Sequence, residues 1–364
     1  MKAAILGCGL IGGSIGLALK GHPGGPSEIV VFDRELGAAR AAVDRGAADR
    51  FELSAAAAVA AADVVFVATP VRSIATAVAD AVPGLKPGAI LTDVGSTKTR
   101  VVVEVESLLP AGVFFVGGHP MAGSEQEGIA GARGDLFEGA WWILTPTEGS
   151  QPATYQFLHG VLTALGARIM ALKPEQHDDL MATVSHLPQL VATTVMNMAA
   201  DRGKDHAGLL ALAAGGFRDV TRVAASNPDI WLDICRDNKD AIVIALGEAA
   251  NRLLALRDLV QDEDLEGLGD VLAAAREARK SLPGKATEGE AYEIRVPVPD
   301  RPGVLAEVTT SVGNLGVNIE GLDITHAEEG GQGFLRLSIL GADNTRRVRE
   351  ILQRLGYEPT DTEL

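Results

Sequence analysis

The chain has 364 residues, 47% of them hydrophobic and 22% charged, which is ordinary for a globular protein of two or three domains. Its net charge of −16 argues against nucleic acid as the main partner, and an anionic ligand would need a local cationic site. The two cysteines, Cys8 and Cys235, lie far apart and indicate no disulfide framework. No apolar run reaches the about 18 residues of a membrane span, and no signal peptide precedes the first predicted strand. We therefore expect a cytoplasmic protein that has no metal site and no membrane attachment.

Residues 1–170 alternate short β-rich runs with alanine-rich helical stretches, a pattern typical of a parallel sheet with crossover helices. They predict an α/β domain of the Rossmann type. The predicted strands are 3–6, 29–32, 64–68, 90–93, 114–117 and 142–144. The predicted helices include 14–19, 37–45, 73–82 and 101–108.

Residues 171–282 lose the strand pattern and predict an all-α domain, with long helices over 179–200 and 229–260. Many positions in these helices are apolar around much of the circumference, which favours burial against other helices or a second subunit. We therefore expect a homodimer that forms through this domain.

A polar stretch with proline and glycine, residues 283–290, is typical of a linker. Beyond it, residues 291–364 predict a small α+β domain with the order β-α-β-β-α-β, as in a ferredoxin-like sandwich. The predicted elements are strands 292–297, 317–325 and 334–340, helices 304–315 and 345–355, and a hairpin turn at 330–333.

A glycine-rich turn follows the first predicted strand, where Gly7, Gly9 and Gly12 have the G-x-G-x-x-G spacing and open an apolar helix. Such glycines permit close approach of a pyrophosphate, whose charge the helix N-terminus stabilises. Asp33 ends the next strand, where a carboxylate favours NAD, although Arg34 could receive the 2′-phosphate of NADP. The alternative is a glycine turn in a domain that binds no nucleotide. The predicted cofactor-binding residues are Gly7, Gly9, Leu10, Ile11, Gly12, Asp33, Arg34, Thr69 and Pro70.

His119 lies in a nearly charge-free stretch, residues 117–125, whose sequence is Gly-Gly-His-Pro-Met-Ala-Gly-Ser-Glu. Histidine has an unperturbed pKa close to neutrality, so a histidine in a glycine-rich loop is a candidate general base. The alternative is a turn with an incidental histidine.

Ser96 and Lys98 follow the predicted strand 90–93 and precede a helix. Both side chains are expected at the carboxyl end of the sheet, where ligands bind in such folds. They could equally be an N-cap serine and a surface lysine.

Two segments of the helical domain carry further polar side chains. Ser185 and Gln189 are four residues apart in a helix that Pro188 is expected to kink, and they share a face. Arg222 closes the segment 215–222, and arginine is the natural bidentate partner of a carboxylate. The two arginines of this segment could also form ordinary surface salt bridges.

Together these segments resemble the prephenate/arogenate dehydrogenase family. The resemblance covers nearly all of residues 1–282, and its motifs are 7–14, 93–98, 117–125, 185–189 and 215–222, with Trp231, Asn238 and Lys239. Residues from 292 onward resemble an ACT domain, a small amino-acid-sensing fold, through the runs 300–305 and 316–319.

The resemblance implies oxidation of prephenate, a cyclohexadiene with a ring hydroxyl, a ring carboxylate and a pyruvyl side chain. Removal of the hydroxyl proton while NAD accepts hydride, followed by loss of carbon dioxide, gives 4-hydroxyphenylpyruvate in tyrosine biosynthesis. His119 would be the catalytic base, oriented by Ser96. Arg222 would bind the substrate carboxylate with added positive charge from Lys98, and Glu125 would lie near the substrate entrance.

Gln189 departs from many prephenate-specific relatives, which have a histidine at this position. Its neutral amide can donate a hydrogen bond but supplies no positive charge. Two substrates therefore stay open: prephenate, whose side chain is a keto acid, and arogenate, whose side chain is an amino acid.

The ACT resemblance implies an amino-acid effector, and tyrosine is the expected feedback inhibitor of an enzyme that leads to it. Its carboxylate would bind at the N-terminus of the first helix of this domain. The alternative is a domain retained only for contacts between subunits. The predicted regulatory residues are Asp300, Arg301, Pro302, Gly303, Asn318 and Ile319.

Two other functions compete with this one. Another enzyme of the same fold, such as a β-hydroxyacid dehydrogenase or an imine reductase, would need a catalytic lysine or a different helical motif. It would also leave residues 117–125 and Arg222 unexplained. A non-catalytic regulator that binds a nucleotide and an amino acid is disfavoured by the set of Ser96, His119 and Arg222.

Overall fold

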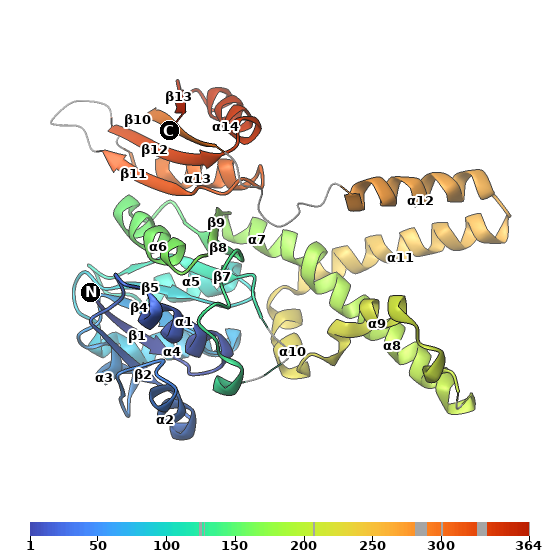
Figure 1. Ribbon diagram of the computed structural model, residues 1–364, viewed down its shortest axis with the longest axis horizontal. Helices are drawn as coiled ribbons and strands as arrows, with labels where there is room; N and C mark the ends of the chain where they lie inside the picture. Colours follow the sequence, from blue (N-terminus) through green and yellow to red (C-terminus); the bar gives the residue numbers. More distant parts are fainter. Residues whose placement is uncertain are drawn as a thin grey trace. The chain divides into compact units, whose positions relative to one another are not determined.

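The computed structural model describes residues 1–123, 126, 128–206, 208–280, 290–299, 301–325 and 333–363. The chain divides into two compact units, drawn in Figure 1. The first unit joins Met1–His177 to Glu288–Leu364, and the second unit is Asp178–Thr287. We call 1–177 the N-terminal domain, 290–363 the C-terminal domain, and the second unit the helical unit. Glu125, Asp300, the predicted turn at 330–332 and almost all of the predicted linker lie outside the described residues.

The N-terminal domain is built on a six-stranded parallel sheet, which confirms the predicted Rossmann-type architecture. The strand order is β3-β2-β1-β4-β5-β6, so β1 and β4 lie side by side at the point where the chain reverses direction across the sheet. Ligands bind at the carboxyl ends of the strands beside such a switch point. The strands are β1 (Lys2–Leu6), β2 (Glu28–Phe32), β3 (Arg50–Phe51), β4 (Val64–Val67), β5 (Ile90–Asp93) and β6 (Phe114–Phe115).

Helices cover both faces of this sheet, because its strands are apolar on both sides. Ile5 and Phe66 belong to one hydrophobic cluster, and their chain neighbours Leu6 and Val65 belong to the other. The helices are α1 (Leu10–Gly21), α2 (Leu36–Asp44), α3 (Ala55–Val59), α4 (Ile74–Ala81) and α5 (Thr99–Leu108). Short 3₁₀ turns occupy Val71–Ser73, Val82–Gly84, Ile129–Gly131, Leu210–Leu212 and Arg222–Ala225.

A second, three-stranded sheet follows, where the sequence predicted two more strands of the first sheet. It contains β7 (Gly117–Pro120), β8 (Trp141–Thr145) and β9 (Arg168–Ala171), with α6 (Pro152–Ala164) before β9. The predicted strand 114–117 is therefore wrong as one element. Its backbone follows β5 up to Val116, whose N–H donates to Leu91, and Gly117 then pairs with Thr145 of β8.

The C-terminal domain has the predicted β-α-β-β-α-β order, and its antiparallel sheet has the strand order β11-β12-β10-β13. The predicted strand 317–325 begins later, at Gly321. Residues 318 and 319 instead bond to the N-terminal domain, through Ile169 N–H to Asn318 Oδ1 (2.6 Å) and the His159 ring to the Ile319 carbonyl (2.8 Å). The elements are β10 (Ala291–Val298), α13 (Val304–Gly313), β11 (Gly321–Thr325), β12 (Gly333–Leu340), α14 (Ala342–Arg354) and β13 (Thr360–Glu363).

The N-terminal and C-terminal domains pack together through one continuous hydrophobic cluster. Helix α13 lies against β9, and α6 lies against β11 (Figure 1). Gly313 permits this approach, because a Cβ atom there would lie 1.9 Å from the carbonyl oxygen of Ala171. We call this contact the seam.

The helical unit contains the all-α structure that the sequence predicted, with more interruptions. The predicted helix 179–200 is divided by a π-helical turn, Ala182–His186, because Pro188 has no N–H to continue the regular ladder. The predicted helix 229–260 breaks at Asn238. Helix α7 (Pro174–Met181) begins in the N-terminal domain and ends in the helical unit. The other helices of this unit are α8 (Leu187–Asp205), α9 (Gly215–Thr221), α10 (Pro228–Asp237), α11 (Lys239–Gln261) and α12 (Leu265–Lys280).

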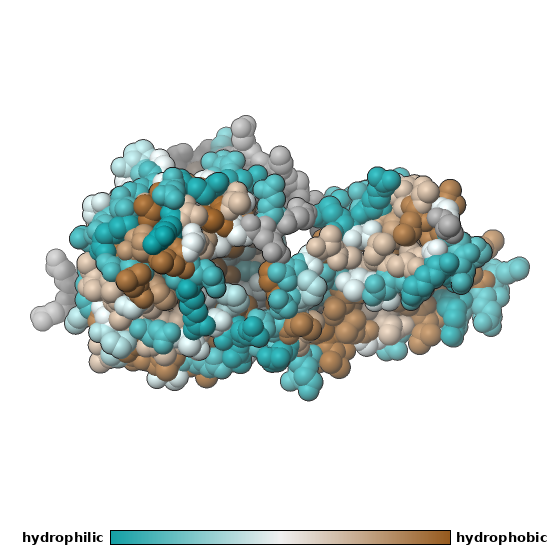
Figure 2. All heavy atoms as spheres, turned by 90° about the horizontal axis from the view of Figure 1, so that it is seen from below, coloured by the Kyte–Doolittle hydropathy of each residue, from teal (hydrophilic) through white to brown (hydrophobic). Residues whose placement is uncertain are grey.

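Much apolar surface of the helical unit is open to solvent, as Figure 2 shows from one side. Its buried cluster comprises only Ala182, Ile234, Ile242 and Ala245 among the described residues. Large side chains such as Ile244, Leu253 and Leu272 are more than half exposed. Within the described parts of the chain, no helix is long and apolar enough to cross a membrane.

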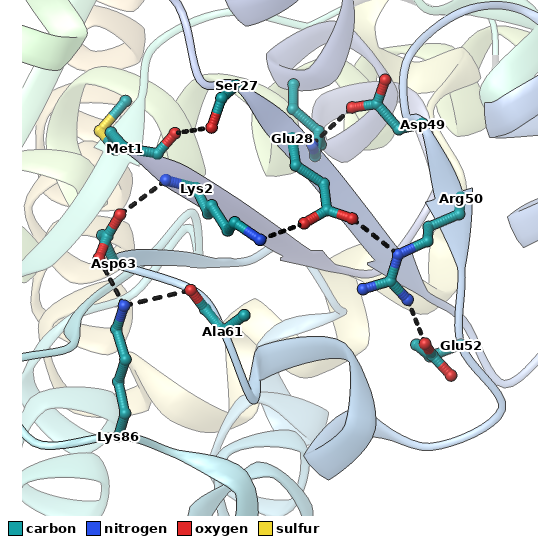
Figure 3. A network of polar contacts seen from close by, with 11 residues as sticks. Met1, Lys2, Ser27, Glu28, Asp49, Arg50, Glu52, Ala61, Asp63 and Lys86 are labelled. Atoms are coloured by element: carbon teal, nitrogen blue, oxygen red, sulfur yellow. Dashed lines mark hydrogen bonds and ion pairs between the residues drawn. The ribbon is translucent and has the colours of Figure 1, made fainter.

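A network of ion pairs joins the amino ends of the parallel strands (Figure 3). Lys2 and Arg50 both bind Glu28, at 2.8 Å each, and hold the pKa of its carboxyl down at about 2. Lys86 binds Asp63 at 2.6 Å. The network lies at the edge opposite the carboxyl ends of the strands, so we assign it a structural role.

Candidate active site

The glycine turn between β1 and α1 has the geometry that a pyrophosphate site needs. Gly7 adopts φ +103°, and a Cβ atom there would lie 2.4 Å from the carbonyl oxygen of Ala68. Gly9 is the N-cap of α1 and has no side chain to occupy the space above the helix. Leu10, Ile11 and Gly12 form the first helical turn, whose N–H groups have no partner within the helix. This end of α1 can therefore bind an anion.

A cavity of about 230 Å³ opens beside this turn. It is lined by the predicted residues Gly7, Gly9, Asp33, Arg34, Thr69 and Pro70, together with Asp80 of α4. The Asp33 carboxylate accepts the N–H of Cys8 at 2.7 Å and that of Glu35 at 2.8 Å, which fixes it at the end of β2. The Arg34 guanidinium lies 3.8 Å from the Asp80 carboxylate. Burial and the neighbouring Asp33 raise the pKa of the Cys8 thiol to about 12, so this cysteine stays a thiol.

His119 lies in strand β7, opposite Ile143 of β8, and the expected loop begins only after Pro120. The prediction of a histidine in a loop is therefore wrong. Its Nδ1 is 2.8 Å from Nε2 of His177, and the two rings meet edge to face. His177 is fully buried in the first turn of α7, and its backbone N–H donates to the Lys173 carbonyl. Two neutral imidazoles at this distance share one proton, so each ring orients the other.

A buried ion pair holds the backbone just before His119. The Lys98 ammonium binds the Asp93 carboxylate, and both side chains are fully buried. Asp93 accepts the Gly118 N–H at 3.1 Å, and Lys98 donates to the Gly118 carbonyl at 2.8 Å. Both polar groups of Gly118 are therefore fixed by the pair. The interpretation of Lys98 as a surface lysine is wrong.

Ser96 lies half-buried in the loop between β5 and α5, two residues before Lys98. Lys98 is the N-cap of α5, so the alternative interpretation of Ser96 as the cap of this helix is wrong. The loop leaves the carboxyl end of β5, which is adjacent to β4, and β4 leads to Thr69 at the cofactor cavity. Ser96 therefore belongs to the ligand edge of the sheet.

Ser185, Gln189 and Arg222 belong to the helical unit. Ser185 is half-buried in the π-helical turn, Gln189 is buried near the start of α8, and Arg222 is exposed where α9 ends. The π turn is held by Asn238, whose amide donates to the Asp178 carbonyl (2.6 Å) and lies 3.2 Å from the His186 ring. Helical turns of this kind occur frequently at functional sites.

The predicted regulatory residues lie on two sides of the C-terminal domain's contact with the N-terminal domain. Asn318 and Ile319 are buried in the seam. Arg301, Pro302 and Gly303 precede α13 and line a cavity of about 780 Å³. Arg301 forms an ion pair with Glu307, which also accepts the Tyr357 hydroxyl at 2.8 Å.

Three residues of this arrangement were missed by the sequence analysis: Asp93, His177 and Asp80. Asp93 is the first residue of the motif 93–98, and its position at the end of an apolar strand is the signal that marks it. His177 and Asp80 carry no local signal, because each meets its partner through a contact between distant segments.

Family models match three consecutive parts of the chain. The model described as prephenate dehydrogenase, nucleotide-binding domain, matches residues 15–171. The model described as prephenate dehydrogenase, dimerization domain, matches residues 173–274. The ACT domain model matches residues 292–357.

Individual proteins of known identity are similar over most of the chain. The prephenate dehydrogenase of Bacillus subtilis is 36% identical over 365 residues, which cover 98% of each chain. The crystal structure of the Aquifex aeolicus prephenate dehydrogenase with hydroxyphenyl propionate and NAD+ has a TM-score of 0.72 and 30% identity, covering 78% of this chain and 98% of that one. Synechocystis arogenate dehydrogenase has a TM-score of 0.67 and 31% identity, covering 77% of this chain and 99% of that one.

Proposed function

The chain belongs to the prephenate dehydrogenase family, and we propose that it catalyses the NAD-dependent oxidative decarboxylation of prephenate to 4-hydroxyphenylpyruvate. The observation that supports this most directly is the paired imidazole of His119, positioned next to the ligand edge of a dinucleotide-binding sheet. A protein that only bound nucleotide and effector would not need a histidine oriented in this way.

His119 acts as the general base in this proposal. A tautomer in which its Nδ1–H donates to His177 Nε2 leaves the lone pair on Nε2 of His119. That nitrogen accepts the proton of the substrate hydroxyl, and the imidazolium is stabilised by sharing the Nδ1 proton with His177. Asp93 and Lys98 are positioning residues in this proposal, because they bind each other and fix the backbone of Gly118. The Lys98 ammonium is fully buried in this pair, so we assign it this role in place of the added positive charge at the substrate that the resemblance implied.

The residues of the glycine turn fit NAD. The first turn of α1 would hold the pyrophosphate, and Asp33 would hold the adenosine ribose hydroxyls. NAD bound there would supply the hydride acceptor for the oxidation of the carbon that carries the substrate hydroxyl. NAD is favoured over NADP because Asp33 and Asp80 both face the cavity, whereas Arg34 is their only cationic neighbour among its lining residues.

Arogenate is the second candidate substrate. Arg222 binds the ring carboxylate in either case, and Ser185 and Gln189 contact the side chain. The neutral amide of Gln189 does not favour a keto-acid side chain over an amino-acid side chain. An arogenate dehydrogenase is also among the similar structures. We propose that Glu125 acts near the substrate entrance, in a salt bridge or in gating, and not in proton transfer.

One experiment distinguishes the candidates. NADH or NADPH formation is measured with prephenate and with arogenate, each in the presence of NAD+ and of NADP+. We expect the highest kcat/KM with prephenate and NAD+. A higher kcat/KM with arogenate would identify arogenate as the preferred substrate. Absence of NADH or NADPH formation with all four pairs would show that the chain oxidises neither prephenate nor arogenate.

We also propose that tyrosine inhibits the enzyme through the C-terminal domain and that the chain is a homodimer through its helical unit. The ACT family match and the end-product relation support the first proposal. The dimerization-domain match and the exposed apolar surface of α11 and α12 support the second.

A further inference from the structure

The small sheet that carries His119 has two edges, and each is held by a different domain. Its strand order is β7-β8-β9, so β7 and β9 are the edge strands. The edge of a sheet presents a row of backbone N–H and C=O groups, and buried groups of this kind need partners. The residues that supply these partners therefore fix the position of the sheet.

The β7 edge is held by the buried ion pair of the N-terminal domain. The Gly118 N–H donates to the Asp93 carboxylate at 3.1 Å, and the Gly118 carbonyl accepts the Lys98 ammonium at 2.8 Å. Gly118 immediately precedes His119 in the strand. This edge therefore carries the backbone that presents the catalytic base.

Successive residues of β9 turn their backbone groups to opposite sides of the strand. The N–H groups of Arg168 and Leu172 both donate to carbonyls on the β8 side. The backbone N–H and C=O groups of Ile169 and Ala171 alternate with these residues and face away from β8. They form the outer edge of the sheet.

The C-terminal domain supplies the contacts of this outer edge. The Ile169 N–H donates to Asn318 Oδ1 at 2.6 Å, and Asn318 Nδ2 donates to the Glu320 carboxylate at 2.6 Å. Gly313 of α13 lies on Ala171, where an added Cβ would lie 1.9 Å from the carbonyl oxygen. Asn318 and Gly313 are both buried. Asn318 and α13 therefore cover the β9 edge in place of a further strand (Figure 1).

One row of residues joins the two edges across the sheet. Gly118 of β7 is paired with Leu144 of β8, and Leu144 is paired with Ala171 of β9. His119 and Ile143 form the adjacent pair. Neighbouring strands lie about 4.8 Å apart, so the row is about 10 Å long. A displacement of the β9 edge therefore reaches the peptide before His119 through two hydrogen-bonded ladders.

We infer that the C-terminal domain positions the catalytic base through this sheet, independently of any effector. Asn318 and Gly313 are positioning residues, because they fix the outer edge of the sheet whose opposite edge carries His119. The inference rests on the proposed function for the role of His119 as the base. It gives the C-terminal domain a part in the basal activity, and it assigns Asn318 to the sheet edge, whereas the resemblance implied an effector contact.

Steady-state kinetics of the full chain test this role in the absence of tyrosine, with NAD+ and whichever of prephenate and arogenate the wild type oxidises. Asn318→Ala leaves the Ile169 N–H without its partner, so kcat should fall about tenfold or more, because a small displacement of a base has effects of this size. The KM for the substrate and the NAD+ affinity should stay within about twofold. Asn318→Ser keeps a hydroxyl that can accept an N–H, so it should retain more of kcat, and it carries the comparison if the alanine variant does not fold.

Gln156→Ala is the matched control. Gln156 donates a side-chain amide bond to the Leu322 carbonyl (3.2 Å) across the same seam, but from α6 and not from the sheet. Its loss should leave kcat within about twofold. Equal falls in kcat in Gln156→Ala and Asn318→Ala would show that the seam as a whole, and not the β9 edge, controls the base. That result would overturn the inference.

Amide hydrogen exchange tests the connection across the sheet without any substrate. In Asn318→Ala, peptides that contain β9 and peptides that contain β7 should both exchange about fivefold or more faster than in the wild type, whereas β7 should be unchanged in Gln156→Ala. Faster exchange in β9 alone, or an unchanged kcat in Asn318→Ala, would overturn the inference. A wild type that oxidises neither substrate would reject the proposed function instead, and the exchange rates would still decide whether the C-terminal domain holds β7.

Discussion

Among the described residues, the His119 ring is oriented by His177, and the preceding peptide is fixed by Asp93 and Lys98. Of these contacts, the one with His177 involves a group that can share the proton gained during the reaction. Removal of either partner of the buried Asp93–Lys98 pair destabilises the fold, because it leaves an uncompensated buried charge. The role of His119 as the base and the roles of the residues that position it can therefore be tested with separate variants.

Replacement of the base tests its role directly. His119→Asn keeps a polar side chain of similar size but cannot accept the hydroxyl proton. We expect kcat to fall by about 10²–10⁴-fold. NAD+ affinity, measured by fluorescence titration, should stay within about twofold, because His119 is not among the cofactor-cavity residues. Loss of NAD+ binding would mean that His119 supports the cofactor and is not the base.

Asp80 tests the origin of the cofactor preference. It neutralises Arg34 and adds a second carboxylate at the cavity mouth, so Asp80→Ala should free Arg34 for a 2′-phosphate. Exposed pairs of this kind contribute about 0.2–1 kcal/mol, so NADP+ affinity should rise up to about fivefold in calorimetric titration.

NAD+ affinity provides the internal comparison and should change little in Asp80→Ala. Asp343→Ala removes an acidic partner of an exposed ion pair from the C-terminal domain and should alter neither affinity. Unchanged NADP+ binding in Asp80→Ala would leave Asp33 as the sole acidic determinant of the preference.

At the scale of elements, local patterns predicted the four central strands of the main sheet, β1, β2, β4 and β5, and the fold class of each of the three domains, because burial on both faces leaves a continuous apolar signal. The two-residue edge strand β3 was not predicted, because so short a strand leaves no such signal. They failed where a contact with a distant segment decided the structure. Gly117 pairs with Thr145 of the second sheet and not with a strand of the first. Asn318 accepts the Ile169 N–H with its side chain and does not belong to a strand. The candidate site divides in the same way: the motif residues were recognisable, whereas His177 needed the fold to bring it to His119.

The seam gives a pH prediction. His159 of α6 is buried against Ile319, and burial lowers its pKa below the usual value, although its bond to the Ile319 carbonyl opposes this. Above pH about 6.5 the ring is neutral in both the folded and the unfolded states, and the stability contribution is complete. As the pH falls below about 6.5 the unfolded state takes up the proton first, so the free energy of unfolding decreases.

The measurement compares melting temperatures of the wild type and His159→Gln at pH 8 and pH 5.5. Glutamine keeps an N–H donor for the Ile319 carbonyl but does not titrate. We expect the wild type to lose more thermal stability than the variant between these pH values. Equal losses would show that protonation of His159 does not weaken the seam.

At the scale of the whole molecule, the two units differ in how they bury apolar side chains. The first unit encloses one large cluster that runs through both of its domains, whereas the helical unit leaves much apolar surface exposed. On α11, Leu246, Leu253 and Val260 follow one another at seven-residue spacing, and all three are exposed. Such a stripe is typical of a helix that packs against a partner helix.

Leu253→Lys tests whether this stripe binds a second copy of the chain. A charge placed in a packed apolar interface should cost at least about 2 kcal/mol, which is about 30-fold in Kd. Light scattering after size-exclusion chromatography at low micromolar concentration should show a dimer for the wild type and a large monomer fraction for the variant. Leu53→Lys is the matched control, since Leu53 is 78% exposed in the N-terminal domain and should leave the mass unchanged. A dimer that persists in Leu253→Lys with unchanged Kd would place the subunit contact on another face, because a lysine ammonium cannot be buried there without loss of affinity.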